Sequence, residues 1–162
     1  MRRVLIDTNV ALDVVLDRQP HSAMSAALLS AVEAGRCEGY LAAHAFTTIF
    51  YLTAKQRNRA TAHRAVRYLL SFLRVAEVDD AVVRRAALVE HADFEDAVTA
   101  AAAEAARCDA IATRDPAGFR HGPVRAIAPD LILAVLAEEV HESAGVYGGT
   151  SKRRRRRKTK RA

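Results

Sequence analysis

Three aspartates stand where their carboxylates could converge on one metal ion. Asp7 directly follows the apolar run 4–6, and Asp115 comes shortly after a second apolar run, 110–112. Short apolar runs of this kind are typical of buried strands. In open parallel sheets, ligands bind beyond the carboxyl ends of the strands. A third acid, Asp96, lies near the start of an alanine-rich segment that favours a helix.

The chemistry that such a cluster supports is metal-assisted hydrolysis. Carboxylates packed together repel one another, and a divalent cation relieves that repulsion. Mg²⁺ prefers hard oxygen ligands and keeps several of its waters, so a few carboxylates are enough to hold it. An ion held in this way can activate a water and neutralise charge on a phosphate oxygen. The spacing alone therefore predicts a carboxylate metal site.

Each acid also has a structural interpretation. Asp7 is a good residue to cap a following helix. Asp93, three residues before Asp96, resembles a capping arrangement, and a structural role is favoured for it. Asp115 precedes Pro116, a pair that is common in turns. The functional interpretation rests on three acids together at positions that an α/β fold uses for ligands.

The elements that must position these acids alternate along the chain. Strands are predicted at residues 4–6, 40–42, 75–78, 110–112 and 124–127. Helices are predicted between Asp7 and Pro20 and at residues 22–34, 44–56, 60–72, 80–89, 93–106 and 129–139. Such alternation predicts an α/β fold, a three-layer α/β/α sandwich around a mainly parallel sheet of four to five strands.

The charge divides the chain into two parts. The net charge is +6, yet residues 151–161 carry nine Lys or Arg and no acid, which leaves 16 basic and 19 acidic residues elsewhere. A single domain at residues 1–141 is therefore mildly acidic. Residues 142–162 are predicted to be a disordered basic tail. An acidic domain that acts on a polyanion needs cations to do so, from metals or from its own tail.

The composition favours a cytoplasmic protein and excludes several classes. Cys37 and Cys108 form no CxxC pair, so neither a disulfide scaffold nor a zinc knuckle is expected. Asp7 interrupts the first apolar run, which argues against a secretory leader. Residues 131–137 are too few to span a bilayer. The sequence contains no phosphate-binding loop, nucleophile-elbow or zincin motif.

Two segments carry a family pattern: LIDTNVALDVVLDR at residues 5–18 and DFEDAVTAAAAEAARCDAIATRDPAGF at residues 93–119. Together they resemble the PIN domain (PilT N-terminal type), and in particular the VapC-type toxin nucleases. The resemblance covers about residues 4–137. It implies a ribonuclease that uses Mg²⁺ or Mn²⁺ to hydrolyse RNA by a metal-activated water. It also implies a homodimer and a small antitoxin partner that blocks the site.

The same resemblance assigns roles to individual residues. Asp7, Asp96 and Asp115 match the catalytic, metal-binding acids. Asn9 of the DTN motif matches a supporting polar residue, and Thr113 matches the hydroxyl near the last acid. Beside them, Arg114 is a candidate to bind a substrate phosphate, and Asn9 and Thr113 are expected to lie at the same substrate-binding site.

One departure from the family pattern bears on the number of metals. PIN domains commonly carry a Glu in the helix after the second strand, and Thr48 stands at that position here. Glu95, beside Asp96, is a candidate to supply the missing carboxylate. A PIN-like module with weak or absent catalysis, binding RNA or protein through its surface, is the alternative that Thr48 favours.

Basic residues outside the site have two interpretations. The tail, residues 152–161, either gathers RNA through salt-sensitive phosphate contacts or has no dedicated role. An arginine cluster at positions 57, 59, 64 and 67 is either an exposed polar face or a phosphate track. His44 begins a helix near Thr48, and a structural role is favoured for it.

Overall fold

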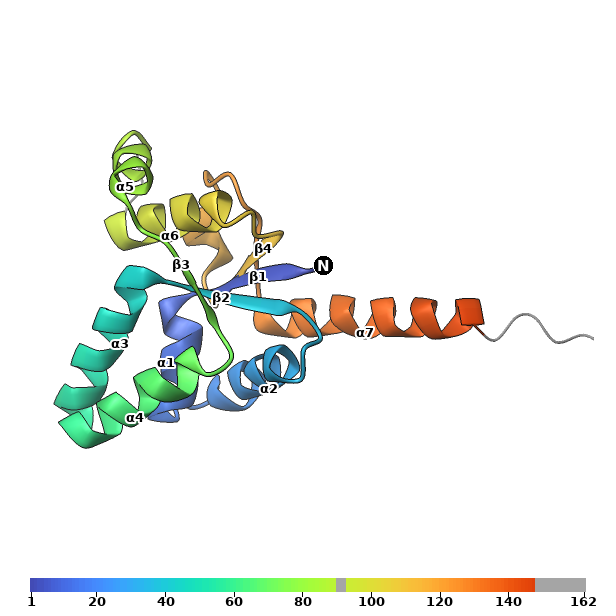
Figure 1. Cartoon of the computed structure of the whole chain (residues 1–162), viewed down its shortest axis with the longest axis horizontal. Helices are drawn as coiled ribbons and strands as arrows, with labels where there is room; N and C mark the ends of the chain where they lie inside the picture. Colours follow the sequence, from blue (N-terminus) through green and yellow to red (C-terminus); the bar gives the residue numbers. More distant parts are fainter. Residues whose placement is uncertain (90–92, 148–162) are drawn as a thin grey trace, which may run out of the picture.

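The sheet of this protein is five-stranded and parallel throughout. A computed structural model describes residues 1–89 and 93–147, and Figure 1 shows the sheet between two layers of helices. The strand order is β3-β2-β1-β4-β5. The strands are β1 (Arg3–Ile6), β2 (Glu38–Ala42), β3 (Arg74–Ala76), β4 (Ala110–Ala112) and β5 (Ala126–Ile127). The predicted three-layer α/β/α fold is confirmed.

Helices cover both faces of the sheet. The helices are α1 (Thr8–Leu16), α2 (Ser22–Glu33), α3 (Ala43–Gln56), α4 (Arg59–Leu70), α5 (Asp80–Ala87), α6 (Phe94–Ala105) and α7 (Pro129–Tyr147), with a 3₁₀ turn, η1 (Pro116–Phe119). One hydrophobic core lies between the sheet and α1, α2, α3 and α7. The second lies under α5 and α6, where alanines allow the helix to approach the sheet closely.

The central strand β1 divides its side chains between the two cores. Val4 and Ile6 are fully buried in the first core, and Leu5 is fully buried in the second. This alternation follows from the period of two in a strand. The backbone N–H of Asp7 then donates to the carbonyl of Ala112 at 2.9 Å. The end of β1 is therefore fixed beside the end of β4, the arrangement that the proposed site needs.

Some element boundaries differ from the predictions. β3 ends at Ala76 rather than residue 78, because the chain turns there toward α5, which Asp79 caps by accepting at Oδ1 from the N–H of Val82 at 2.9 Å. The last helix extends to Tyr147 rather than residue 139, and residues 139–144 contain no Gly or Pro to end it. Of the predicted tail, residues 142–162, the part from residue 148 onward lies outside the described residues, and the domain boundary stays a prediction.

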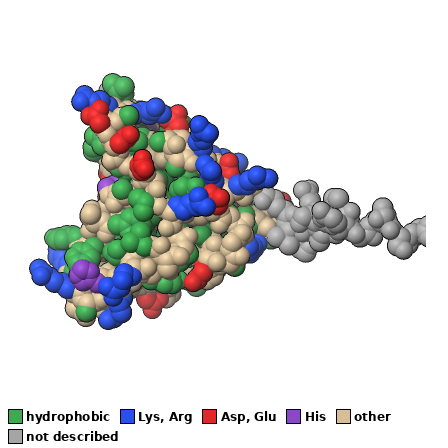
Figure 2. Space-filling model, in the orientation of Figure 1, with side chains coloured by type: hydrophobic (Ala, Val, Ile, Leu, Met, Phe, Trp, Pro, Cys, Tyr) green, Lys and Arg blue, Asp and Glu red, His purple; other side chains and the backbone are tan. Residues whose placement is uncertain are grey.

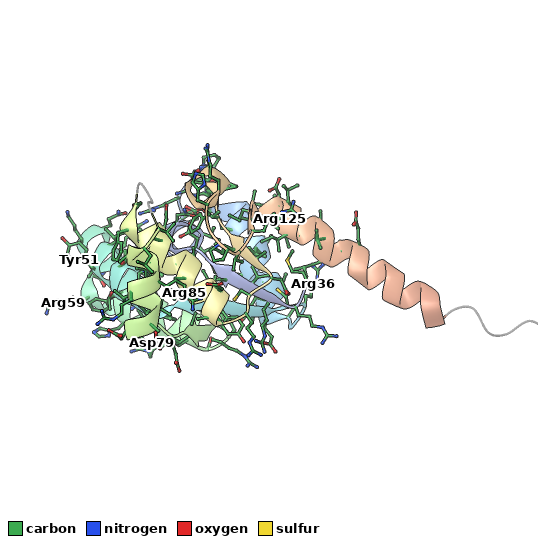
Figure 3. The ribbon with its side chains drawn as sticks, turned by 90° about the horizontal axis from the view of Figure 1, so that it is seen from above. Arg36, Tyr51, Arg59, Asp79, Arg85 and Arg125 are labelled. Carbon is green, nitrogen blue, oxygen red and sulfur yellow. The ribbon has the colours of Figure 1, made fainter. Side chains whose placement is uncertain are left out.

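Two further observations concern the outer surface. Within residues 1–89 and 93–147, every helix is too short or too polar to cross a bilayer. Basic side chains gather at the end of the α3–α4 hairpin, at the lower left of Figure 2. Figure 3 shows Tyr51 and Arg59 at this outer edge of the molecule. The arginines at positions 57, 59, 64 and 67 are all exposed.

Gly39 marks the closest approach between β2 and the helical layer. A Cβ at this position would meet Val32 Cγ1 and would lie 2.6 Å from Leu73 Cδ2. Both neighbours are buried in the first core. The small residue is therefore required by packing, because a methyl group would occupy space already filled by these side chains.

We expect Gly39→Ala to lower the free energy of unfolding by about 1–3 kcal/mol, the usual cost of overpacking a filled core. Denaturant unfolding measures this. The double variant Gly39→Ala/Val32→Ala is the control, because removing the Val32 methyls makes room for the new one. A double variant that loses the sum of the two single losses would contradict the packing argument.

Candidate active site

Asp7 is a buried carboxylate held by two neighbours. Only 4% of it is exposed. Its Oδ2 accepts from Thr113 Oγ1 at 2.7 Å and from Asn9 Nδ2 at 2.5 Å. Burial raises the pKa of Asp7 above its ordinary value, and the Thr113 hydrogen bond opposes that rise. Asp7 is the N-cap residue of α1, but its side chain makes no capping hydrogen bond of its own, so capping alone does not account for this carboxylate.

Thr113 connects Asp7 to the third acid. Thr113 is fully buried at the end of β4, and its Oγ1 also accepts from the backbone N–H of Asp115 at 3.1 Å. Asp115 Oδ1 accepts from the N–H groups of Ala117 and Gly118, at 3.2 and 3.3 Å. The turn interpretation of Asp115 is therefore correct, and this capping fixes one carboxylate oxygen while leaving the other for a ligand.

Asp96 reaches the same place from α6. A Cβ at Gly118 would lie 2.9 Å from Asp96 Oδ2 and 3.4 Å from Asp115 Oδ2, so the two oxygens are separated by no more than the sum of these distances. The pKa of Asp96 is raised to about 6, first by burial and then by the negative charges of Asp7, Asp93, Glu95 and Asp115. The acids predicted from the sequence therefore influence one another electrostatically.

A cavity of about 190 Å³ opens beside these acids. Its lining comes from α1, α3 and α6, and consists of Asp7, Thr8, Asn9, Leu12, Thr48, Leu52, Glu95 and Asp96. Thr48 thus lies at the cavity, in the place where the family pattern has its Glu. Asn9 lies there too, and its Oδ1 is 3.5 Å from the N–H of Arg114.

Thr8 and His44 were not assigned to the site from the sequence, and both contact Glu95, which was. Glu95 Oε1 accepts from Thr8 Oγ1 at 3.0 Å and lies 3.9 Å from His44 Nε2. His44 Nε2 is also 3.4 Å from Thr99 Oγ1. Burial lowers the pKa of His44, which favours the neutral ring. The sequence feature that could have placed His44 near the cavity is its position four residues before Thr48, which puts both side chains on one face of a helix.

Arg114 forms an ion pair within the protein, and its predicted role in binding a substrate phosphate stays a prediction. Its Nε lies 3.2 Å from Oδ2 of Asp13, a fully buried carboxylate on α1. The side chain predicted to bind a substrate phosphate is therefore already paired within the protein. Asp13 was missed, although an acid inside the apolar segment of α1 was a signal that it has a buried partner. Asp93 has its expected structural role, because its Oδ1 accepts from the N–H of Glu95 at 2.8 Å.

The donor set suits a hard divalent cation. No three His, Cys, Asp or Glu side chains in the described part of the chain are already arranged to hold a metal. The nearby groups are carboxylate, hydroxyl and amide oxygens. Burial first, and then the neighbouring negative charges, raise the pKa of Asp96. Mg²⁺ keeps several waters and is commonly bound through one or two carboxylates, so these residues fit such an ion.

Comparison with known proteins decides the family. A sequence profile described as the PIN domain matches residues 3–117. The chain belongs to the PIN-domain family. A search of curated protein sequences gives no significant match.

Solved structures share the PIN fold. VapBC2 from Rickettsia felis, bound to a promoter DNA fragment, is similar with a TM-score of 0.62 and 12% identity over 78% of this chain and 98% of that one. FitAcB from Neisseria gonorrhoeae has a TM-score of 0.60 and 22% identity, and the match covers 78% of this chain and 97% of that one. VapC20 from Mycobacterium tuberculosis, a toxin that cleaves the sarcin–ricin loop, has a TM-score of 0.57 and 16% identity, covering 67% and 86%.

The raised pKa of Asp96 predicts a pH-dependent loss of stability without metal. The folded state keeps the Asp96 proton up to about pH 6, whereas the unfolded chain loses it near pH 4, so stability falls as pH rises between these values. Asp96→Asn removes this fall. At pH 7 in EDTA we expect the variant to be more stable than the parent by roughly 1 kcal/mol, after allowing for solvent screening at a partly exposed carboxyl.

Thermal unfolding from pH 4 to 7.5 measures the difference between parent and variant. The control is Asp80→Asn, which removes an exposed carboxyl on α5 that pairs with Arg84. An Asp96→Asn variant that is less stable than the parent at pH 7, or a difference that does not change with pH, would contradict the proposed crowding of charge.

Proposed function

We propose that this protein is a divalent-metal-dependent endoribonuclease and the toxin of a toxin–antitoxin pair. The observation that carries the proposal is the gathering of Asp7, Asp96 and Asp115 at the carboxyl ends of β1 and β4, with the pKa of Asp96 raised to about 6. Proteins of the PIN family are nucleases that generally use divalent metal ions, and family membership supports the same chemistry here.

Each residue has a distinct part in this function. Asp7, Asp96 and Asp115 would hold Mg²⁺ or Mn²⁺, and Asn9 and Thr113 orient the Asp7 carboxylate through their hydrogen bonds. Such an ion would lower the pKa of a bound water and neutralise charge on a phosphate oxygen. The amides of η1 keep Asp115 in place. Hydrolysis by this route leaves 5′-phosphate and 3′-hydroxyl ends on the RNA.

The toxin assignment draws on the structural neighbours. Several are complexes of a toxin with its antitoxin, including one from Klebsiella pneumoniae with a TM-score of 0.57 and 18% identity. VapC20 is a toxin that cleaves an RNA loop. These likenesses support an RNA substrate and a small antitoxin partner for this chain. A homodimer is proposed from membership in the PIN family, and a cytoplasmic location from the cysteine content of the sequence.

A PIN-like module with weak catalysis is the second candidate. Thr48 favours it, because this residue at the cavity supplies a hydroxyl where the family pattern has a carboxylate. Glu95 lines the same cavity, and its charge raises the pKa of both Asp7 and Asp96. We propose that Glu95 restores part of the negative charge that Thr48 lacks, which favours the active enzyme.

We expect the full chain to cleave single-stranded RNA with Mn²⁺ or Mg²⁺ and to stop cleaving in EDTA. Asp7→Asn, Asp96→Asn and Asp115→Asn should each reduce the rate by more than about a hundredfold, since losing groups that only support metal ligands already costs about 10–100-fold. Single-turnover cleavage of a labelled RNA measures this.

Two further variants sharpen the experiment. Asp80→Asn is the matched control, because it neutralises an acid on α5 that does not line the cavity. Glu95→Gln should weaken Mn²⁺ affinity by about tenfold or less, as expected for a group that acts beside the ligands. RNA binding without cleavage in any metal would favour the binding module instead.

The toxin assignment has its own test in bacterial cells. Expression of the protein alone should arrest growth, because unrestrained RNA cleavage stops translation. Asp96→Asn should relieve the arrest at equal protein abundance, measured by immunoblot. Arrest that persists with Asp96→Asn would separate toxicity from the nuclease site and would overturn the assignment.

A further inference from the structure

Arg114 is held at two points by one face of α1. Its backbone N–H lies 3.5 Å from Asn9 Oδ1, and its side-chain Nε lies 3.2 Å from Asp13 Oδ2. Asn9 and Asp13 are four residues apart in a helix, so they lie one above the other on the same face. Two successive turns of α1 therefore hold the main chain and the side chain of a single residue.

The Asp13 carboxylate is costly for the protein to bury. Asp13 is 0% exposed, and Ser25 Oγ of α2 donates to its Oδ2 at 3.1 Å. Its other oxygen, Oδ1, is buried without a hydrogen-bond partner among the described residues. An unsatisfied buried oxygen destabilises a fold, and a buried ion pair often gives no net stability compared with apolar side chains. Stability alone therefore does not account for this pair.

The position of Arg114 in the chain indicates a second purpose. Arg114 lies between Thr113, whose hydroxyl holds Asp7, and Asp115, whose N–H donates to that same hydroxyl. β4 ends at Ala112, so residues 113–115 lie beyond the end of the strand. The side chain of Arg114 points back to α1 and ties this short segment to the helix that begins directly after Asp7.

We propose that Asp13 is a positioning residue, which acts through Arg114 to hold residues 113–115 so that Thr113 and Asp115 face Asp7. The proposal rests on the proposed nuclease function and adds a buried residue that touches neither metal nor RNA. A displacement of about 1 Å in a catalytic group can reduce a rate strongly. The Asp13–Arg114 pair therefore determines where Thr113 and Asp115 lie relative to Asp7, without itself contacting the metal or the RNA.

The competing role for Arg114 is direct binding of an RNA phosphate. Its side chain is 31% exposed and also lines a cavity between the starts of α2 and α7. The two roles predict different kinetics. If Arg114 binds a phosphate, its loss raises the KM for RNA, and Asp13 is not required. If the pair acts by positioning, the loss of either Asp13 or Arg114 lowers kcat and metal affinity to the same extent.

The experiment compares four variants of the full chain: Asp13→Asn, Arg114→Gln, the double variant, and Ser25→Ala. Ser25→Ala is the control, because it removes the other hydrogen bond to the same Asp13 oxygen without touching residues 113–115. RNA cleavage, Mn²⁺ affinity by calorimetry and thermal unfolding are measured for each, with activities taken well below the melting temperatures.

We expect Asp13→Asn and Arg114→Gln each to reduce kcat by about 10–100-fold, with little change in the KM for RNA. The double variant should lose no more than either single variant, because both remove one interaction. Ser25→Ala should lose stability and keep its kcat. Arg114→Lys keeps the charge but loses the planar fork, and it should recover only part of the rate.

A readout that does not use activity separates this proposal from the proposed function. Hydrogen exchange of the amides at residues 114 and 115 should become faster in Asp13→Asn and Arg114→Gln, and should be unchanged in Ser25→Ala. If the parent protein neither binds Mn²⁺ nor cleaves RNA, but the two variants still exchange faster than it does, the nuclease function is overturned and the positioning role of Asp13 is kept. Unchanged exchange, a KM effect confined to Arg114→Gln, or a loss of kcat that follows the melting temperature in all variants would overturn the positioning role.

Discussion

The carboxylates of Asp7, Asp96 and Asp115 repel one another, and the rest of the fold must hold them in place against that repulsion. Asp7 directly follows β1 and Asp96 lies in the first turn of α6, and each has a pKa raised first by burial and then by neighbouring negative charge. The fold holds these charges together with two packed cores, one on each face of the sheet. A cation of high charge is the simplest species that converts this unfavourable arrangement into a favourable one. The same charge repulsion that lowers stability in the absence of metal makes this place favourable for a metal ion.

The hydrogen bonds around Asp7 define its orientation. Thr113 and Asn9 both donate to the same oxygen, Oδ2, and Asp115 is linked to it through the Thr113 hydroxyl. Behind this group, Arg114 and Asp13 connect the end of β4 to α1. The site is therefore built from the ends of two adjacent parallel strands, the first turns of the elements that follow them, and the first turn of α6. Its place beyond the carboxyl ends of the strands is the one expected for an open α/β sheet.

The sequence was sufficient for those features that depend on local patterns. Short apolar runs in the sequence predict buried strands such as 4–6 and 110–112, and the positions of Asp7 and Asp115 were predicted because these acids follow such runs. The contacts that the sequence missed join distant segments. Thr8 and Glu95 are 87 positions apart, and nothing in either segment indicates that they meet. The ion pair between Arg114 and buried Asp13 likewise joins segments about a hundred positions apart, and neither segment indicates it.

In the proposed active state, Asp7, Asp96 and Asp115 share one divalent cation. Crystals of the full chain soaked in Mn²⁺ at pH 7.5, with anomalous diffraction recorded near the manganese edge, test it most directly. We expect one strong anomalous peak at coordination distance, about 2.0–2.6 Å, from carboxylate oxygens of these three residues, as for hard cations on oxygen ligands. A peak elsewhere, or none at this cluster at saturating Mn²⁺, would contradict it.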